Sequence, residues 1–381
     1  MIPKETAVKE LIEAEEHHQL LPFYREVIAP KRNHQLDLLR IIFAVMVLLS
    51  HAPELTDGNR SREILSRLTT SEFSFGMLGV DGFFLLSGYL IVKSWVNRPD
   101  LWGFIQKRFL RIAPGYAVAA LVALIIVGLV APGESHFFRL HLLRWDTVKS
   151  FIFLYRPSSL PLVFPGNPYP VLNGSLWTIL YEFRCYIFVA VWGMLGLFKR
   201  PKLWLGVTTI LMVFLTIFFL QDTLTKHLPW SWVMYQFLGD PSRLLRFVTV
   251  FFVGGCFFLF KNWVKFSPTF AWLCVCGILA VRFIKPEHIE VAFVVFGGYL
   301  LFYFGSKPIT ALAWMAKVPD LSYGIYLYGW PVESLLIWRF HPSPWIVFTL
   351  STIICAGLAW LSWTFVEAPA LSLKSKTLKC P

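Results

Sequence analysis

The sequence predicts an all-α polytopic membrane protein, a bundle of about ten transmembrane helices with both termini in the cytoplasm. Only 15% of its 381 residues are charged, whereas a soluble domain carries about 25%. Mean hydropathy is +0.60, and hydrophobic residues make up 56% of the chain. Apolar runs recur from end to end, and cations gather in alternate segments between them. This composition argues against an ordinary soluble enzyme.

About ten apolar runs have the length that a bilayer requires, roughly 20 residues of helix each. The shorter runs suit tilted or broken helices. An even number of spans places the two termini on the same side of the membrane. The runs lie near residues 37–53, 75–96, 112–131, 174–197, 203–221, 244–260, 268–284, 287–304, 320–340 and 344–367.

The distribution of basic residues indicates on which side of the membrane the two termini lie. The positive-inside rule places cation-rich segments in the cytoplasm, and the intervening segments here are mixed in sign or longer. We therefore interpret the net charge of +12 as topology, and we expect no nucleic-acid partner. The cation-rich segments are Lys31-Arg32, residues 97–111, 198–202 and 261–265, and a tail with Lys374, Lys376 and Lys379.

This pattern divides the chain into three predicted parts. Residues 1–35 lack the apolar region of a signal peptide, so we expect insertion to be driven by internal spans. Apolar residues amid glutamates predict a cytoplasmic amphipathic helix there, with a poorly ordered tail as the alternative. Residues 36–368 form the ten-span domain, and residues 369–381 form a short basic cytoplasmic tail.

The longest external segment is 132–173. Its apolar stretch at 148–155 is too short to span a bilayer, so we interpret it as re-entrant or as lining a cavity. The turn-rich stretch at 165–174 predicts an ordered loop over the mouth of the bundle. Five of the six cysteines lie inside apolar runs, where cysteine behaves as a small hydrophobe, so we expect neither a structural disulfide nor a metal.

Ionisable side chains within the runs cost about 2.5–3.5 kcal/mol each and usually face the interior of a bundle. The first run carries Arg40 and His51, eleven positions apart. That separation is about 16 Å along a helix, and roughly 100° per residue returns both side chains to one face. The alternative is that each reaches its own membrane surface. The side chains that we single out are Arg40, His51, Asp81, Lys93, Glu182, Arg184, Arg282, Glu333, Arg339 and Glu367.

Two acids are candidates to assist His51. By helical rise, Asp81 lies about 9 Å and Glu182 about 12 Å below the outer surface. A carboxylate beside an imidazole fixes its tautomer and stabilises the imidazolium, as a general base requires. We therefore expect Asp81 or Glu182 to orient His51. The alternative for each acid is a structural pairing with Arg184 or Arg339.

A third acid, Glu333, lies in the outer half of the ninth run. It shares this half of the predicted bundle with His51 and the other two acids. For Glu333 we expect the structural role, as a partner of Arg184 or Arg339.

The opposite side of the bundle has a basic character. Arg108 and Arg111 precede the third run and are neighbours on one helical face at i,i+3. Arg40 enters from the same side, and guanidinium groups bind phosphate in a bidentate manner. The alternative is a topology signal alone. An acyl-coenzyme A would fit such a bundle, because its phosphates could stay at the arginines while its thioester reached His51.

Six stretches, in order, carry a family resemblance over about residues 40–367. In each case the residue types and their spacing are similar to those of the acyltransferase-3 family of integral-membrane O-acyltransferases. A lone Arg and His with ten residues between them is a weak signal, whereas six collinear motifs are a specific one. The stretches are LDLLRIIFAVMVLLSHA, GVDGFFLLSGYLI, KRFLRIAPGY, NGSLWTILYEFRCYIF, LSYGIYLYGWPV and TFVEAPAL.

The resemblance implies an enzyme of about ten spans in the bacterial inner membrane, which moves an acyl group from cytoplasmic acyl-coenzyme A to an external hydroxyl. It implies acetyl as the group, a glycan or glycolipid as acceptor, and no tightly bound cofactor. His51 matches the family's essential histidine, and Asp81 and Glu182 match its acidic positions. Arg40, Arg108 and Arg111 match arginines associated with the donor. We assign the acceptor or its pocket to Asn173, Trp177 and Tyr326 in the fourth and fifth stretches.

Two positions depart from the family pattern. Phe183 stands where many members have a second glutamate, and Gly329 stands where many have a histidine. His51 is therefore the only histidine that we place at the site. The rival interpretations are a transporter or flippase that uses the same charges as a relay, and a structural scaffold that would tolerate loss of His51.

Overall fold

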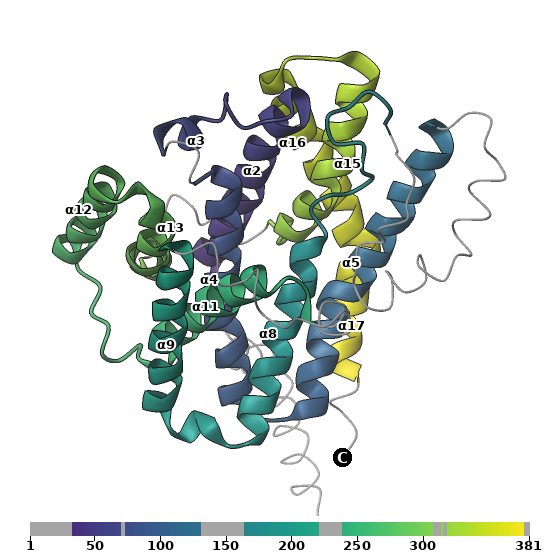
Figure 1. The fold of residues 1–381 in the computed structure, drawn as a ribbon. Coiled ribbons are helices and arrows are strands. Elements are labelled where there is room, and N and C mark those ends of the chain that lie inside the picture. The colour runs from purple at the N-terminus through teal and green to yellow at the C-terminus, as the bar shows by residue number, and fades with distance from the viewer. Residues whose placement is uncertain are drawn as a thin grey trace, which may run out of the picture.

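A computed structural model describes residues 33–69, 73–130, 164–220, 238–307, 314 and 318–376, and the regular elements in these ranges are all helices (Figure 1). The all-α class is thus confirmed. The longer helices are α2 (His34–Asp57), α4 (Phe75–Asn97), α5 (Leu101–Val130), α8 (Trp177–Met194), α9 (Pro201–Leu220), α11 (Pro241–Leu259), α12 (Pro268–Ile284), α15 (Ser322–Phe340) and α16 (Pro344–Ser362). The shorter ones are α3 (Ile64–Leu68), α13 (Ile289–Ala292), α14 (Gly298–Ser306) and α17 (Ala368–Lys376), with π-helical turns at Phe293–Gly297 and Trp363–Glu367.

Each predicted apolar run coincides with a helix or with helices joined end to end. Among the described residues, five helical segments are long and apolar enough to cross a membrane. Two shorter apolar helices are Pro201–Ile217 and Pro268–Ile284. The count of ten spans and the cytoplasmic placement of both termini stay predictions. The five segments are His34–Asp57, Phe75–Asn97, Pro241–Leu259, Pro286–Ser306 and Pro344–Leu373.

Polar side chains set the starts of several helices. Asn33 accepts hydrogen bonds from the backbone at the start of α2, and Ser74 does so at the start of α4. Asp100 accepts from the Gly103 amide at 3.0 Å, and α5 begins at Leu101, about three turns before the predicted start of the third run at residue 112. Arg108 and Arg111 therefore lie within α5 rather than in a linker before it.

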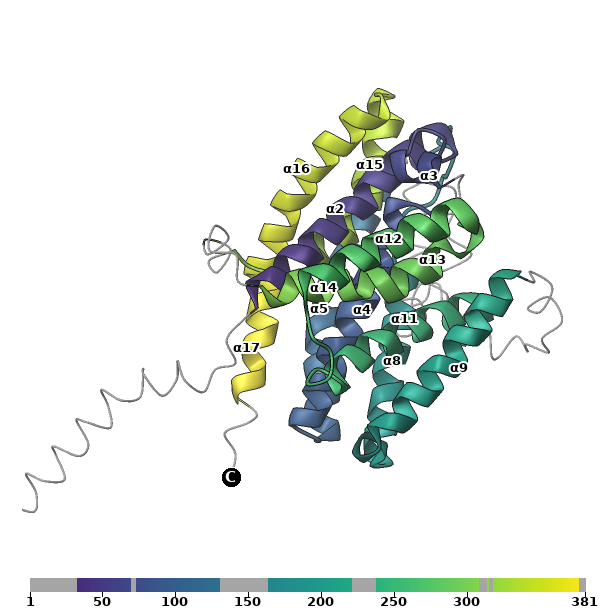
Figure 2. The same cartoon turned by 90° about the vertical axis from the view of Figure 1, so that its left-hand side faces the viewer.

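Four helices form the centre of the bundle. α4 packs against α2 and α11, and α15 packs against α2 and α16, while α9 and α16 lie on opposite sides of the bundle (Figure 2). α4 and α11 approach closely because glycines meet backbone: a Cβ at Gly88 would lie 2.0 Å from the Phe251 carbonyl oxygen. A Cβ at Gly254 would likewise lie 2.1 Å from the Leu85 carbonyl oxygen. This pair of contacts sets the spacing between the two helices.

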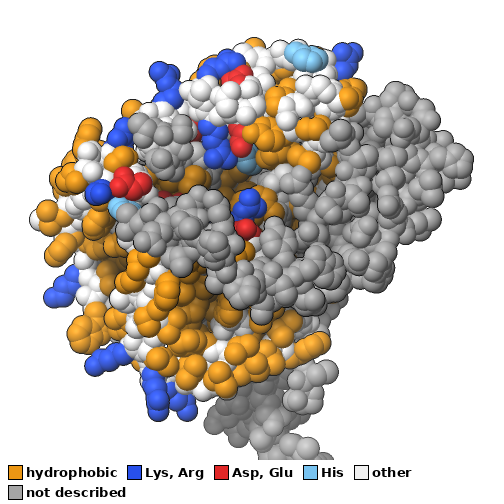
Figure 3. Space-filling view, in the orientation of Figure 1, with side chains coloured by type: hydrophobic (Ala, Val, Ile, Leu, Met, Phe, Trp, Pro, Cys, Tyr) orange, Lys and Arg blue, Asp and Glu red, His pale blue; other side chains and the backbone are white. Residues whose placement is uncertain are grey.

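Large apolar side chains remain on the outside of the bundle. Hydrophobic groups cover most of the lower half of the face in Figure 3, with Lys and Arg along its lower left edge, where α8 and α9 join in Figure 1. Apolar surface of this extent is typical of a lipid-facing belt. Strongly exposed examples are Ile210, Phe214, Trp272, Phe283, Ile353 and Phe365.

The turn-rich stretch at 165–174 lies against the end of the bundle, as predicted. Asn167 donates to the Ser334 carbonyl oxygen at 2.9 Å, and Tyr169 donates to the Gly58 carbonyl oxygen at 3.1 Å. These bonds join the loop to α15 and to the end of α2. The predicted amphipathic segment up to residue 32, the stretch at 148–155 and the last residues of the tail lie outside the described residues.

We predict that Gly88→Ala destabilises the protein by about 1–3 kcal/mol, because the added methyl group must push α4 away from α11. Gly357→Ala on α16 is the matched control, since no atom lies within 4 Å of its added Cβ. That change should be neutral or slightly stabilising. Thermal unfolding of the detergent-purified variants checks both, and an unchanged midpoint for Gly88→Ala would contradict the prediction.

Candidate active site

Two of the three candidate arginines meet at one carboxylate. Arg40 Nη1 on α2 lies 2.7 Å from Oδ2 of Asp320, and Arg111 Nη2 on α5 lies 2.6 Å from the same oxygen. Arg111 Nη1 also lies 3.9 Å from Oε2 of the buried Glu367. We call this part of the bundle the Arg40 end. A network of ion pairs there joins α2, α5 and α15.

Arg108 stands apart from this network. Its Nη2 donates to Ser94 Oγ at 2.9 Å, and its guanidinium lies 5.9 Å from the ring centre of Tyr186. Its Nε is buried without a hydrogen-bond partner. Arg108 thus keeps its positive charge without an acidic ion-pair partner among the described residues.

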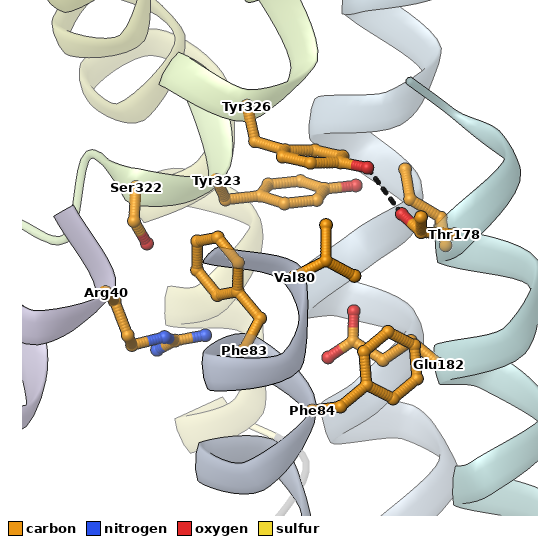
Figure 4. A pocket seen from close by; sticks show the side chains of 10 residues that line it. Arg40, Val80, Phe83, Phe84, Thr178, Glu182, Ser322, Tyr323 and Tyr326 are labelled. Carbon is orange, nitrogen blue, oxygen red and sulfur yellow. Dashed lines mark hydrogen bonds between the residues drawn. The ribbon is translucent and has the colours of Figure 1, made fainter. Parts of the chain in front are cut away.

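A pocket opens from the Arg40 end toward the middle of the bundle. The pocket and the open space at its mouth together comprise about 530 Å³ not filled by atoms. In Figure 4, Arg40 and Glu182 reach into this pocket from opposite sides, and the Tyr326 hydroxyl points to Thr178. The wall combines aromatic rings with a few polar groups, the usual composition of a small-molecule site. Its lining residues are Arg40, Val80, Phe83, Phe84, Thr178, Ile179, Glu182, Ser322, Tyr323 and Tyr326.

His51 lies outside the pocket lining, beside Trp330, which is one helical turn along α15 from the pocket-lining Tyr326. Its ring packs edge-on against Trp330, with ring centres 5.0 Å apart. Trp330 follows Tyr326 by four positions on α15, so the two side chains lie on the same face of that helix. The His51 Nδ1 atom is buried without a hydrogen-bond partner. A polar nitrogen that is buried and unpaired is costly in a folded protein, and a catalytic role is one of the explanations for it.

The first candidate acid, Asp81, pairs with an arginine that the sequence analysis did not consider. Asp81 Oδ1 lies 3.0 Å from Arg246 Nη2 on α11, and Arg246 Nε lies 2.5 Å from Glu290 Oε1. All three side chains are largely buried. Within the described residues, no hydrogen bond joins Asp81 to His51. The alternative for Asp81, a pairing with Arg184 or Arg339, is also not what the structure shows.

The second candidate acid, Glu182, lines the pocket below His51 rather than contacting it. Its Oε1 accepts from Ser87 Oγ at 3.0 Å and from the Tyr186 hydroxyl at 2.5 Å. These donors fix the carboxylate between α4 and α8. Among the described residues, Glu182 also makes no hydrogen bond to the imidazole.

The expected pairing of Glu333 with Arg184 or Arg339 is wrong. Glu333 is fully buried between α15 and α16, where Ser351 Oγ donates to its Oε1 at 3.2 Å. Arg339 lies on the exposed end of α15 over the ring of Phe340. Depth estimated from residue number along each predicted helix placed these groups at similar levels, but their side chains face different helices.

The three candidate acceptor residues separate into two groups. Asn173 Nδ2 donates to the Leu327 carbonyl oxygen at 3.0 Å, and the Tyr326 hydroxyl donates to the Ser175 carbonyl oxygen at 2.6 Å. These bonds tie the start of α8 to α15, and Tyr326 closes the pocket. Trp177 instead packs on Phe247 of α11 and lies outside the pocket lining.

Sequence reasoning missed three charged residues that the structure places at the centre of its networks: Asp320, Arg246 and Glu290. Signals for them were present. Arg246 and Glu290 lie inside predicted spans, where any charge needs a partner, and Asp320 opens a predicted span. No three His, Cys, Asp or Glu side chains in the described ranges come together as a metal site.

Comparison with known proteins agrees with this arrangement. The model of an acyltransferase domain matches residues 33–364, so the chain belongs to the acyltransferase-3 family of membrane acyltransferases. The match covers the pocket and both of its ends. No solved structure matches this chain.

Three relatives are similar at low identity. Nodulation protein 10 of Rhizobium leguminosarum biovar viciae is 28% identical over 378 residues, which cover 90% of this chain and 94% of that protein. The O-acetyl transferase of Shigella phage Sf6 is 25% identical over 360 residues, which cover 91% and 98%. The peptidoglycan O-acetyltransferase of Listeria monocytogenes is 27% identical over 369 residues, which cover 82% of this chain and 55% of that protein.

We predict that Arg246→Met destabilises the fold by about 3–5 kcal/mol, because it leaves the carboxylates of Asp81 and Glu290 buried without a cation. Arg243→Met, one turn earlier on α11 and exposed, is the matched control and should cost little. Thermal unfolding midpoints measure both effects. Adding Asp81→Asn to Arg246→Met should recover part of the loss; if the two effects simply add, the ion pair does not carry the stability.

Proposed function

We propose that the protein transfers an acyl group, most simply acetyl, from cytoplasmic acyl-coenzyme A to a hydroxyl of a glycan or glycolipid on the outer side of the bacterial inner membrane. One observation carries the proposal. A pocket lined by Arg40 runs between α2, α4, α8 and α15 and reaches Tyr326, one helical turn along α15 from the Trp330 that packs on His51. The names of two relatives, an O-acetyl transferase and a peptidoglycan O-acetyltransferase, support the chemistry and the class of acceptor.

The ends of the pocket suit the two ends of an acyl-coenzyme A. Its phosphates are anionic, and guanidinium groups such as Arg40, Arg108 and Arg111 bind phosphate oxygens through paired N–H donors. Its pantetheine arm is thin enough for a channel walled by aromatic rings. Arg40 and His51 lie on one helix about 16 Å apart along its axis, a span that the arm can bridge. In this proposal the arginines bind the phosphates or line the path along which the thioester enters.

His51 acts as the general base in the proposed reaction. It accepts the proton of the acceptor hydroxyl while the oxygen attacks the thioester carbonyl carbon. The carbon–sulfur bond then breaks, and the imidazolium returns the proton to the departing sulfur. An acyl-histidine formed by attack of the imidazole itself is the alternative path, and it uses the same residue. Both paths convert one thioester and one hydroxyl into one ester and one thiol.

Glu182 and Asp81 take different places in this proposal. Glu182 faces the pocket, where its carboxylate interacts with the donor arm on its way to His51. Asp81 acts through Arg246, by fixing α4 against α11. The Trp330 ring holds the imidazole from the side, and Tyr326 forms the floor beneath it.

We predict that His51→Ala lowers acyl transfer by about 10²–10⁴-fold, the usual contribution of a general base. Purified protein in lipid nanodiscs is given radiolabelled acetyl-coenzyme A and bacterial membrane glycolipid, and both label transfer and release of free coenzyme are measured. His341→Asn is the control, because His341 is exposed at the end of α15 and Asn tolerates its left-handed backbone. Undiminished transfer by His51→Ala would refute the assignment, and donor binding with no transfer by the wild type would favour a transporter.

We predict that Arg108→Gln raises the KM for acetyl-coenzyme A about tenfold or more with little change in kcat, because a charge-assisted hydrogen bond to phosphate is lost. Arg98→Gln, on the exposed segment before α5, removes the same charge away from the pocket and serves as control. Initial rates over a range of donor concentrations separate the two parameters. A KM unchanged by Arg108→Gln would remove this residue from the donor site.

A further inference from the structure

Two helices of the bundle begin with the same three-residue pattern, Asp-x-Ser. At the start of α11, Asp240 Oδ1 accepts from the amide and hydroxyl of Ser242. At the start of α15, Asp320 Oδ1 accepts from the amide of Ser322 at 3.2 Å and from its hydroxyl at 2.5 Å. In both places one carboxylate oxygen satisfies the first turn of a helix. The two starts differ in what the other oxygen does.

The second oxygen of Asp320 holds two arginines. Oδ2 lies 2.7 Å from Arg40 Nη1 and 2.6 Å from Arg111 Nη2. Only 8% of the Asp320 side chain is exposed, so the bonds are shielded from water. At the start of α11, the amides of Ser242 and Arg243 use the first oxygen of Asp240, and no ion pair involves that aspartate among the described residues. A carboxylate can therefore hold the start of a helix without binding arginines, so the contacts of Asp320 with Arg40 and Arg111 need a separate explanation.

The charges of the network explain why an anion is needed there. Arg40 and Arg111 bring two positive charges to a single point, and they would repel one another if nothing lay between them. Asp320 and Glu367 supply two negative charges, so the four side chains together have a net charge of zero. Glu367 lies 3.9 Å from Arg111, further away than Asp320. The carboxylate of Asp320 is thus the main counter-ion of the pair.

Asp320 restrains Arg40 without using all of its donors. Its contact is to Nη1 alone, whereas the guanidinium of Arg40 carries five N–H groups. The Arg40 side chain is 25% exposed and lines the pocket, into which it points in Figure 4. Among the described residues Arg40 makes no other hydrogen bond, and a guanidinium held at one nitrogen is already oriented for an incoming phosphate. Such preorganisation raises affinity by lowering the entropy lost on binding.

We infer that Asp320 is the positioning residue of the donor site: it holds Arg40 and Arg111 at the mouth of the pocket in the orientation that binds the phosphates of the acyl-coenzyme A. This inference rests on the proposed function. Asp320 itself touches neither the thioester nor the acceptor, and it acts through the two arginines. The opposite role, an internal anion that competes with the donor for the same arginines, predicts an effect of opposite sign.

The test compares Asp320→Asn with Asp240→Asn in the full-length protein in nanodiscs. Asparagine caps a helix as well as aspartate does, so both variants keep their helix starts, and only the first loses a counter-ion. Binding of coenzyme A is measured by calorimetry, and KM and kcat by release of free thiol. We expect Asp320→Asn to raise both the Kd and the KM about tenfold with a smaller change in kcat, and Asp240→Asn to change neither.

A second variant keeps the test decisive if Asp320→Asn fails to fold. Ser322→Ala removes a hydrogen bond to Asp320 Oδ1 but leaves the charge and both ion pairs, so a weaker rise in Kd is expected. An unchanged or lower Kd in the variants that fold would overturn the positioning role, and a lower one would identify Asp320 as a competing anion. If wild-type protein binds no coenzyme A, the proposed function fails instead, whatever the variants do.

Discussion

Three helices that are distant in the sequence meet at one carboxylate oxygen. Asp320, at the start of α15, binds Arg40 of α2 and Arg111 of α5, and these contacts fix the mouth of the pocket. A buried charge is costly unless it is paired, so the position of each of these helices depends on the other two. The pocket, its floor at Tyr326 and the histidine beyond it all follow from where α2 and α15 are held.

The same constraint governs the far side of α4. Arg246 of α11 lies between Asp81 and Glu290, so one arginine balances carboxylates from two other elements. Glycines at the contact of α4 with α11 let the backbones approach, and the ion pairs then set the register. The groups of this network are joined by ion pairs that fix the helices, whereas no ion pair holds His51 or Arg108 among the described residues.

Much of the fold could be predicted from the sequence because a bilayer imposes a simple rule on it. Apolar runs of sufficient length must be helices, since their backbone polar groups have no water to bind. Each predicted run coincides with helix in the structure. The same rule marked Arg40, His51, Asp81 and Glu182 as unusual, because charges at that depth need a reason. Motif order then pointed to the family that the comparison shows.

The sequence by itself determined the helical class, the family and the shared face of Arg40 and His51, because these depend on composition and on the period of one helix. Only the tertiary structure decided which charges meet. Depth along a helix axis is readable from residue number, but the azimuth and the neighbour of each helix are not. For that reason Asp81 was expected beside His51 and lies against Arg246, and the counter-ion of the arginine pair, Asp320, became visible only when three helices were placed together.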